Sequence, residues 1–578
     1  MIQYGPNIMA TIFVNDTTIE IGDDEKLNCI QAADRAGVKI PFYCWHPGLS
    51  VVASCRMCLI ETGTQDDEGA AQMVPKLVPA CQTPAKHGTV IRTDSEKVKA
   101  NQQFVQECLL VDHPIDCPIC DQAGECWLQD YYFDYGHETR RADIQPFSSR
   151  RKDIGNNVSL FVDRCIMCSR CVRFTREISG SAELAVIQRG HHSEIDVVDG
   201  QTCDNKLSGN VVDICPVGAL CSKDNLYQQR AWFLKSHSSI CTSCSSGCSI
   251  VADENKQTIY RLRPRYNPNA NDWWMCDIGR HGFKYVHDND RLLHASRKDN
   301  GSQKRLDPEE IVPVLRETIT AVLEKHDASF FVAMFSPFLT CEEAFLLAKA
   351  IKNFSSEIRF ALGPSPVDGE DETFANGFTI HSERAPNRCG VTEILKHFDA
   401  HFLSFETLLS DLQQDKCKTL FVTGGYPKSW WTTDLCEHFE KPETLIYHDI
   451  FDCSATKKAH LTIPAVTFAE KEGSYVNHAL LFQTTDRIIR PRGECRGEGQ
   501  LFWELLQRTG LYSASQVREE LATEITFFSD IADSVPESGV FLGEKRPLNT
   551  LTKQDSFPGS ISQPIPDPRR PDPRTVTG

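Results

Sequence analysis

The stretch RCIMCSRC (164–171) carries three cysteines in a CxxCxxC pattern, and DICPVGAL (213–220) adds a Cys-Pro pair farther along the chain. Thiolates at this spacing, followed by a remote Cys-Pro, are typical of a domain folded around a [4Fe-4S] cluster whose last ligand comes from the far end of the domain. The sequence therefore predicts that one such cluster is held by Cys165, Cys168, Cys171 and Cys215.

A second group of candidate ligands lies upstream, in HPIDCPICDQAGECWLQD (113–130). It consists of His113, Cys117, Cys120 and Cys126. One imidazole and three thiolates suit zinc as well as an iron-sulfur cluster, so the spacing alone leaves zinc open. If a cluster is bound, neutral imidazole in place of one thiolate makes the site less negative, which tunes the reduction potential.

The group nearest the N-terminus is preceded by two local patterns. The segment TIFVNDTTIE (11–20) is typical of two strands around an Asn-Asp turn, and KLNCIQAADRA (26–36) has helical spacing. The four cysteines that follow match a [2Fe-2S] site, although ten residues separate the first two where plant-type ferredoxins have four. A zinc site is the alternative, disfavoured because only one CxxC pair is present. The candidate ligands are Cys44, Cys55, Cys58 and Cys81.

A fourth group lies in CTSCSSGCSI (241–250) and WWMCDIGRHGF (273–283). Its spacing predicts a further [4Fe-4S] cluster, with a zinc ribbon as the alternative. The candidate ligands are Cys241, Cys244, Cys248 and Cys276.

The other cysteines are scattered, and we expect them to be ordinary buried thiols. They are Cys29, Cys108, Cys203, Cys221, Cys341, Cys389, Cys417, Cys436, Cys453 and Cys495. The first residues, MIQYGPNIMA (1–10), lack the features of a secretory signal, so we expect a reducing compartment in which cysteines ligate metals rather than form disulfides.

Charge and hydropathy exclude several classes of partner. The chain has 61 Lys and Arg against 79 Asp and Glu, a net charge of -18, which argues against binding nucleic acid. Its mean hydropathy is -0.34, and no apolar run is long enough to span a membrane, so direct membrane insertion is not expected. Without a GxGxxG or GxxxxGK[ST] motif, the chain is not expected to bind NADH or ATP itself.

Beyond residue 291 the pattern changes to strands alternating with helices. Strand-like segments are centred on 329–335, 419–424 and 444–450, and residues 341–351 have helical spacing. This alternation predicts an α/β domain with a mainly parallel sheet. The end of the chain, 543–578, is rich in Pro, Arg, Asp and Ser, which predicts a disordered tail.

The order of the four motifs over residues 10–290 resembles that of the large iron-sulfur subunit of bacterial respiratory NADH:quinone oxidoreductase (complex I). The segment LTIPAVTFAEKEGSYVN (461–477) extends the resemblance to molybdopterin oxidoreductases. The implied fold is multi-domain, α+β and α/β. We expect a β-grasp [2Fe-2S] domain at 10–95, a His/Cys-ligated [4Fe-4S] domain at 96–139, a linker at 140–157, a ferredoxin-like [4Fe-4S] domain at 158–233, a molybdopterin-oxidoreductase-type [4Fe-4S] domain at 234–290, and a truncated molybdopterin-oxidoreductase-like α/β domain at 291–542.

The resemblance implies an electron relay with one [2Fe-2S] and three [4Fe-4S] clusters, no molybdenum and no substrate-converting site. Electrons would arrive from a flavin-bearing, NADH-oxidising subunit and leave to a two-cluster ferredoxin-like subunit, among other subunits of the peripheral arm, towards quinone. The complex would lie on the cytoplasmic side of the inner (plasma) membrane.

The alternative is a catalytic or relay subunit of an NAD-linked formate dehydrogenase or a hydrogenase. Formate dehydrogenases resemble two-cluster ferredoxins, have a Lys two residues after the last cluster cysteine, and carry a metal-binding Cys or selenocysteine followed by His. Here Ile278 replaces the Lys, and no Cys-His pair occurs. The second ferredoxin cluster is also lost, because its ligand positions are Thr175, Asn205, Ser208 and Val211. Hydrogenases would need further cysteine motifs after residue 300, and the scattered cysteines there do not form them.

Overall fold

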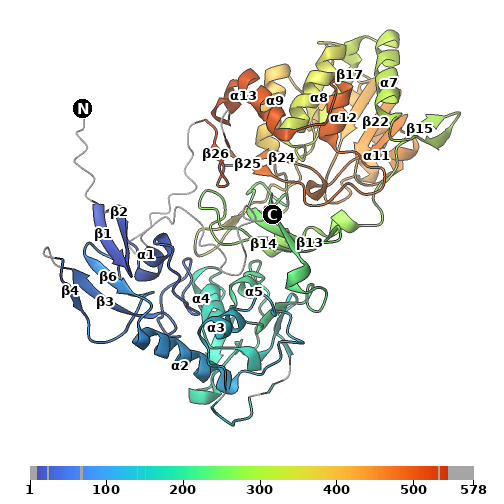
Figure 1. The fold of residues 1–578 in the computed structure, drawn as a ribbon. Coiled ribbons are helices and arrows are strands. Elements are labelled where there is room, and N and C mark those ends of the chain that lie inside the picture. Colours follow the sequence, from blue (N-terminus) through green and yellow to red (C-terminus); the bar gives the residue numbers. More distant parts are fainter. Residues whose placement is uncertain are drawn as a thin grey trace. The chain divides into compact units, whose positions relative to one another are not determined.

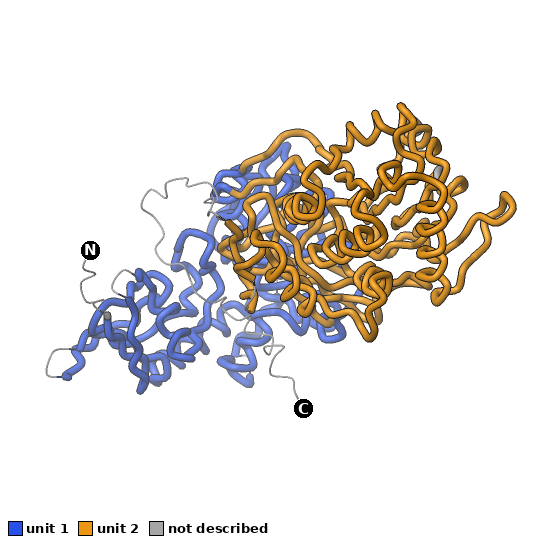
Figure 2. Tube along the Cα trace, turned by 90° about the horizontal axis from the view of Figure 1, so that it is seen from above, with its two compact units in different colours: residues 1–234, 374–377, 550–578 blue, residues 235–373, 378–549 orange. Residues whose placement is uncertain are grey.

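The computed structural model describes residues 9–22, 25–65, 69–139, 141–146, 148–149, 151–531 and 534–543. These residues form two compact units, which are described separately (Figure 2). Unit 1 contains the described residues up to Leu234 together with 374–377, and unit 2 contains 235–373 and the described residues between 378 and 543. The tail expected at 543–578 lies outside the described residues except for Gly543.

Unit 1 begins with a mixed sheet and one helix, α1 (Figure 1). The expected hairpin is present, because β1 and β2 pair antiparallel around Asn15 and Asp16. The strand order is β2-β1-β6-β3-β4, with β1 and β6 parallel and β5 beside β3. Asn28 caps α1 by accepting a hydrogen bond from the Gln31 amide. The bounds are β1 (Met9–Val14), β2 (Thr17–Gly22), α1 (Cys29–Arg35), β3 (Leu59–Gln65), β4 (Ala71–Met73), β5 (Val78–Pro79) and β6 (Thr89–Arg92).

The rest of unit 1 is a set of short elements joined by cysteine-bearing loops. Lys152 and Asp153 form a strand, β7, at the end of the stretch expected to be a linker, and they pair with β8. Their polar side chains gave no strand pattern in the sequence. The bounds are α2 (Glu96–Asp112), α3 (Trp127–Tyr135), β7 (Lys152–Asp153), β8 (Val158–Leu160), η1 (Val162–Arg164), α4 (Arg170–Glu177), β9 (Leu184–Ile187), η2 (Gly190–His192), β10 (Glu194–Val197), α5 (Asn210–Ile214), β11 (Leu220–Ser222) and η3 (Ala231–Phe233).

Unit 2 begins with an antiparallel sheet, β12-β13-β14, followed by α6 and η4. A larger sheet follows in the order β16-β15-β23-β22-β21-β17-β18, and its strands from β23 to β18 are parallel. The α/β expectation is therefore confirmed. The bounds are β12 (Lys235–Ile240), β13 (Ser249–Asn255), β14 (Thr258–Pro264), α6 (Asp277–His281), η4 (Lys284–His287), β15 (Ser296–Asp299), β16 (Ser302–Arg305), β17 (Phe331–Phe335), β18 (Arg359–Leu362), β21 (Thr419–Thr423), β22 (Thr444–Asp449) and β23 (Leu461–Pro464).

Helices and short strands surround this sheet (Figure 1). Their bounds are α7 (Ile311–Lys325), η5 (Ala328–Phe330), α8 (Cys341–Phe354), β19 (Glu372–Thr373), β20 (Thr379–Ile380), α9 (Arg388–Phe398), α10 (Phe405–Gln413), α11 (Thr433–Phe439), η6 (Ser454–Lys457), η7 (Phe468–Glu470), β24 (Gly473–Val476), β25 (Leu481–Thr485), α12 (Glu498–Leu505), α13 (Ala514–Glu524), η8 (Thr526–Ile531) and β26 (Val540–Phe541). Among the described residues, no helix combines the length and apolarity needed to cross a bilayer.

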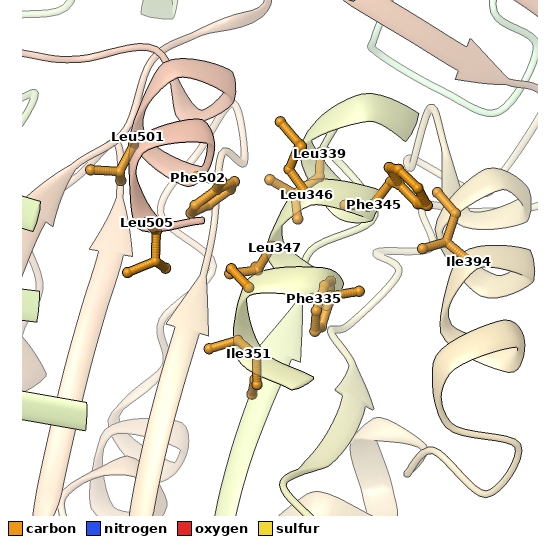
Figure 3. Close-up of a cluster of buried hydrophobic side chains, with 14 of the residues drawn as sticks. Phe335, Leu339, Phe345, Leu346, Leu347, Ile351, Ile394, Leu501, Phe502 and Leu505 are labelled. Carbon is orange, nitrogen blue, oxygen red and sulfur yellow. The ribbon is translucent and has the colours of Figure 1, made fainter. Parts of the chain in front are cut away.

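The helix α8 is the centre of the largest core in unit 2. Its Phe345, Leu347 and Ile351 are buried among side chains of α9 and α12, as Figure 3 shows. Thr340 caps the helix and exchanges hydrogen bonds with Glu343, which is itself buried.

A buried charge network extends from that cap. Lys471 Nζ lies 2.9 Å from a carboxylate oxygen of Glu343 and 3.9 Å from one of Glu498, and all three side chains are buried. Burial makes an unpaired charge costly, so each member depends on the others.

We predict that Lys471→Met destabilises unit 2 by about 3–5 kcal/mol, because it leaves two buried carboxylates without their cation. The deficit should shrink as the pH falls, since a carboxyl that loses its cation takes up a proton more readily. Denaturant unfolding at several pH values measures both effects. The control is Lys396→Met, which removes an exposed ion pair with Glu393 and should cost less than about 1 kcal/mol. Equal losses in the two variants would contradict the role of the network.

Candidate metal centres

Three cysteines of the first group, Cys44, Cys55 and Cys58, lie in the loop between α1 and β3, and Cys81 joins them from the segment after β5. The thiols of Cys55 and Cys81 hydrogen-bond to the Cys44 sulfur and lower the pKa of Cys44, and the Cys81 thiol does the same for Cys58. Backbone amides of Cys55 and Ser54 also donate to the Cys44 sulfur. All four predicted ligands are therefore brought together, with amides that stabilise negative sulfur.

The loop carries two non-glycine residues in the left-handed region, Ala53 at φ 51° and Arg56 at φ 58°. Such residues bend the chain sharply, so that three cysteines from one loop can face a common centre. Four converging thiols fit the ligand requirement of a [2Fe-2S] cluster.

The third group lines a cavity at the start of α4. Cys165, Cys168, Cys171 and Cys215 all face this cavity, together with apolar side chains such as Ile166 and Leu220. Burial raises the pKa of Cys215 to about 11 and raises the pKa of the other three thiols as well. Thiols in such surroundings ionise only when a cation binds, which is what the iron of a cluster supplies. The donor set and the cavity fit a [4Fe-4S] cluster.

The second group is brought together only in part. Cys117 and Cys120 both act electrostatically on Cys126, whose pKa is raised to about 12 chiefly by burial. His113 follows α2 directly, and burial, followed by the nearby Arg164, lowers its pKa to about 4. Its Nδ1 atom is buried without a hydrogen-bond partner, so a neutral imidazole with a free nitrogen is available for iron.

The charged groups that shift the pKa of His113 are Arg164, Asp163 and Asp116 rather than the cysteines. Arg164 is a charged neighbour of both His113 and Cys120. The place of His113 in the ligand set therefore stays a prediction.

The fourth group lies in unit 2, on the loop between β12 and β13 and at the start of α6. Burial raises the pKa of Cys248 well above the ordinary value. The nearby thiolates of Cys241, Cys244 and Cys276 raise it further by charge repulsion. Gly279 fits closely against this group, because a Cβ at its position would lie 2.8 Å from the Cys241 sulfur and 3.7 Å from that of Cys276. Four buried sulfurs, with the side-chain-free Gly279 beside two of them, fit the ligand requirement of a [4Fe-4S] cluster.

In the described part of the chain, no set of three or more His, Cys, Asp or Glu side chains is placed to hold a single metal ion.

The first, second and third groups share one apolar core within unit 1. Cys44, Cys126 and Cys168 belong to the same cluster of buried residues, packed with Tyr43 and Leu128. In Figure 1 the helices α3, α4 and α5 of this region lie close together. The sequence indicated three separate motifs, and the structure joins them in one interior.

Gly218 separates the third group from the second. It lies three residues after Cys215, and a Cβ at its position would overlap the Cys120 sulfur. The adjoining Pro216 carbonyl accepts a hydrogen bond from the Trp127 amide at 2.9 Å. Sequence analysis missed this contact, because a glycine after Cys-Pro has no pattern that reveals its neighbour in space.

The loop 423–430 follows β21, at the edge where α/β sheets often bind ligands. Here Asp449 accepts hydrogen bonds from the Gly425 amide at 2.8 Å and from Trp430 Nε1 at 2.9 Å. The rings of Trp430 and Trp431 pack with centroids 4.3 Å apart. The loop is thus fastened onto Asp449 by its own residues.

Family models match in the order that the motifs predict. They describe a 2Fe-2S iron-sulfur cluster binding domain at 8–96, an NADH-ubiquinone oxidoreductase-G iron-sulfur binding region at 102–141, an NADH-quinone oxidoreductase subunit 3 ferredoxin-like domain at 155–221, a molybdopterin oxidoreductase Fe4S4 domain at 234–288 and a molybdopterin oxidoreductase at 399–508. The chain therefore contains binding domains for both 2Fe-2S and 4Fe-4S clusters.

Curated relatives agree with these models. The chain is 37% identical to the G subunit of an NADH-quinone oxidoreductase from Rickettsia felis over 50% of its own length and 43% of the relative. It is 37% identical to an NADH-ubiquinone oxidoreductase 75 kDa subunit of Reclinomonas americana over 51% and 41%. The resemblance to this iron-sulfur subunit is confirmed. The matched part spans less than half the length of these two relatives.

Among solved structures, a NAD+-reducing [NiFe]-hydrogenase is 27% identical over 38% of this chain and 90% of its own, with a TM-score of 0.33. That score is too low to establish a shared fold.

We predict that Gly218→Ala removes the signal of the second cluster. A methyl group at this position overlaps the Cys120 sulfur, which cannot rotate away while it is bound to iron. Iron analysis and electron paramagnetic resonance (EPR) of the full chain measure the loss, expected to be about four iron atoms. The control is Gly497→Ala, where a Cβ meets nothing within 4 Å. An unchanged spectrum in Gly218→Ala would show that Cys120 does not bind a cluster.

Proposed function

We propose that the chain is an electron-relay subunit of an NADH:quinone oxidoreductase that holds one [2Fe-2S] and three [4Fe-4S] clusters. The proposed ligands are Cys44, Cys55, Cys58 and Cys81 for the [2Fe-2S] cluster, and His113, Cys117, Cys120 and Cys126, Cys165, Cys168, Cys171 and Cys215, and Cys241, Cys244, Cys248 and Cys276 for the others. The clusters supply one-electron redox chemistry, and the protein supplies ligands, apolar surroundings and proximity.

The observation that carries this proposal is the shared interior of unit 1. The third group lies next to both of the others. The charge of Cys44 in the first group raises the pKa of Cys168, and Gly218, three residues after Cys215, packs against the Cys120 sulfur of the second group. Electron transfer between clusters requires short separations through protein, and this arrangement provides them. It supports a path from the first group through the third to the second.

The surroundings of the first, third and fourth groups suit a relay rather than substrate chemistry. Cys58, Cys168 and Cys248 are all buried, so water and small molecules have little access to the metal. A buried cluster changes charge with little solvent reorganisation, whereas a catalytic metal needs an open position.

The names of the relatives, which are subunits of an NADH-quinone oxidoreductase, support the proposal that this chain also works within a multi-subunit complex. Electrons would enter from a flavin-bearing, NADH-oxidising subunit and leave to a two-cluster ferredoxin-like subunit, in contact with other subunits of the peripheral arm. The site of action would be the cytoplasmic side of the inner membrane.

The second candidate is a relay or catalytic subunit of a formate dehydrogenase or hydrogenase. Two observations count against catalysis by the α/β half. Ile278 stands where formate dehydrogenases have a Lys, and the loop 423–430 is fastened onto Asp449. We therefore propose that this half is a structural part that binds no molybdenum.

We predict about 14 iron atoms per fully reconstituted chain. Molybdenum and tungsten should stay far below one atom per chain, even from cells supplied with both metals. Anaerobic iron, sulfide and trace-metal analysis measures these quantities. Eight or fewer iron atoms would contradict at least one of the four groups, and stoichiometric molybdenum or formate-dependent cluster reduction would favour the second candidate.

We predict that His113→Ala changes one EPR signal and slows electron flow from NADH to quinone without unfolding the chain. Three thiolates can retain a cluster while the position of the imidazole opens to water. Circular dichroism serves as the control for folding. An unchanged spectrum and rate would assign His113 to packing alone.

A further inference from the structure

Helix α4 carries two buried arginines between the first and third groups. Arg170 and Arg173 are only 2% and 6% exposed, and their spacing of three residues places them on one face of the helix. The helix contains Cys171 and follows Cys168 closely. Both guanidinium groups therefore lie beside the ligands of the third group.

Each guanidinium also contacts the first group. Arg170 donates to the carbonyl oxygens of Trp45 at 2.6 Å and Ile214 at 3.0 Å, which adjoin Cys44 and Cys215 in the chain. Arg173 donates to the carbonyl of Cys168 at 3.3 Å and to that of Cys44. Each arginine thus connects a ligand segment of one group to a ligand segment of the other.

Aromatic rings surround the more buried of the two cations. The Arg170 guanidinium lies over the ring of Trp127, 4.5 Å from its centroid, and 6.0 Å from that of Phe42. A cation over the face of an aromatic ring is held by the ring quadrupole, which fixes its position without neutralising its charge.

The two positive charges have no carboxylate partner within ion-pair distance among the described residues. Their other contacts are neutral, since Arg173 also donates to the Ser50 carbonyl, and the Nε atoms of both are buried without a hydrogen-bond partner. Glu177, on the same helix, accepts instead from the Ser50 amide at 2.8 Å.

A buried cation is costly unless an opposite charge lies nearby. Carbonyl dipoles and aromatic rings supply part of the compensation. The remaining anionic groups that the proposed function places here are the clusters themselves, each of which carries net negative charge with four thiolates.

We propose that Arg170 and Arg173 are the built-in countercharge of the first and third clusters and raise the reduction potentials of both together. The inference rests on the proposed function, which places a cluster in each group. Reduction adds one electron to a cluster, and a fixed positive charge stabilises the more negative, reduced form. No proton moves in this step, because a guanidinium stays protonated.

The test is an EPR-monitored redox titration of the full chain with reconstituted clusters. Arg170→Gln and Arg173→Gln should each lower the midpoint potentials of the first and third clusters, because they remove the charge while retaining a side-chain donor. Arg173→Lys, which keeps the charge, should lower them much less. The fourth cluster, which lies in unit 2, should keep its potential in every variant.

The matched control is Arg176→Gln, on the same helix with an exposed side chain. It should leave all potentials unchanged. Potentials in Arg173→Gln equal to those of the unaltered chain would overturn the proposal, and so would an equal fall in Arg173→Lys and Arg173→Gln.

If the Gln variants fail to retain the first or third cluster, the Lys variants decide. Retention of both clusters near the original potentials in Arg170→Lys and Arg173→Lys supports the countercharge. Their loss in the Lys variants as well would show that the guanidinium groups act only as clamps on the carbonyls, and would overturn it. Absence of the two signals from the unaltered chain would instead contradict the proposed function.

Discussion

The candidate metal sites of this chain depend on one physical constraint, which is the free-energy cost of ionising a cysteine thiol away from water. Burial raises the pKa of nearly every candidate ligand in the third and fourth groups, so these sites are stable as thiolates only with a positive centre among them. Burial has two effects at these sites. It makes the thiolates require a bound cation, and it excludes water from that cation. The packing of unit 1 and the retention of the proposed clusters therefore depend on the same apolar interior.

Two solutions to the problem of buried charge occur in the two units. In unit 2, Lys471 is neutralised by carboxylates of the protein itself, Glu343 and Glu498. In unit 1, Arg170 and Arg173 face carbonyls and aromatic rings, without a carboxylate in ion-pair range among the described residues. The first arrangement is complete within the polypeptide, and we propose that bound clusters complete the second.

The sequence was informative wherever the decisive residues lie close together in the chain. The hairpin before the first group and the parallel strands of unit 2 both follow from local periodicity. The convergence of the cysteines in the first, third and fourth groups likewise follows from their spacing.

Sequence reasoning failed where contacts join distant segments. Arg170 contacts Trp45, which lies 125 positions earlier in the chain, and the only local signal was the presence of three arginines beside the cysteines of RCIMCSRCVRF (164–174). The loop 423–430 had the position of a ligand-binding loop, but the direction taken by the Trp430 side chain is set by Asp449 on another strand. Such facts depend on packing that no single motif encodes.

The close approach of Gly218 to Cys120 bears on how the protein is built. A Cβ at position 218 would overlap the Cys120 sulfur, so the backbone after Cys215 and the Cys120 side chain fit together only with glycine at that position. If both groups hold the proposed clusters, the two sites share this contact. Oxidative loss of either proposed cluster would then loosen the lining of the other, so the two would be lost together rather than one at a time.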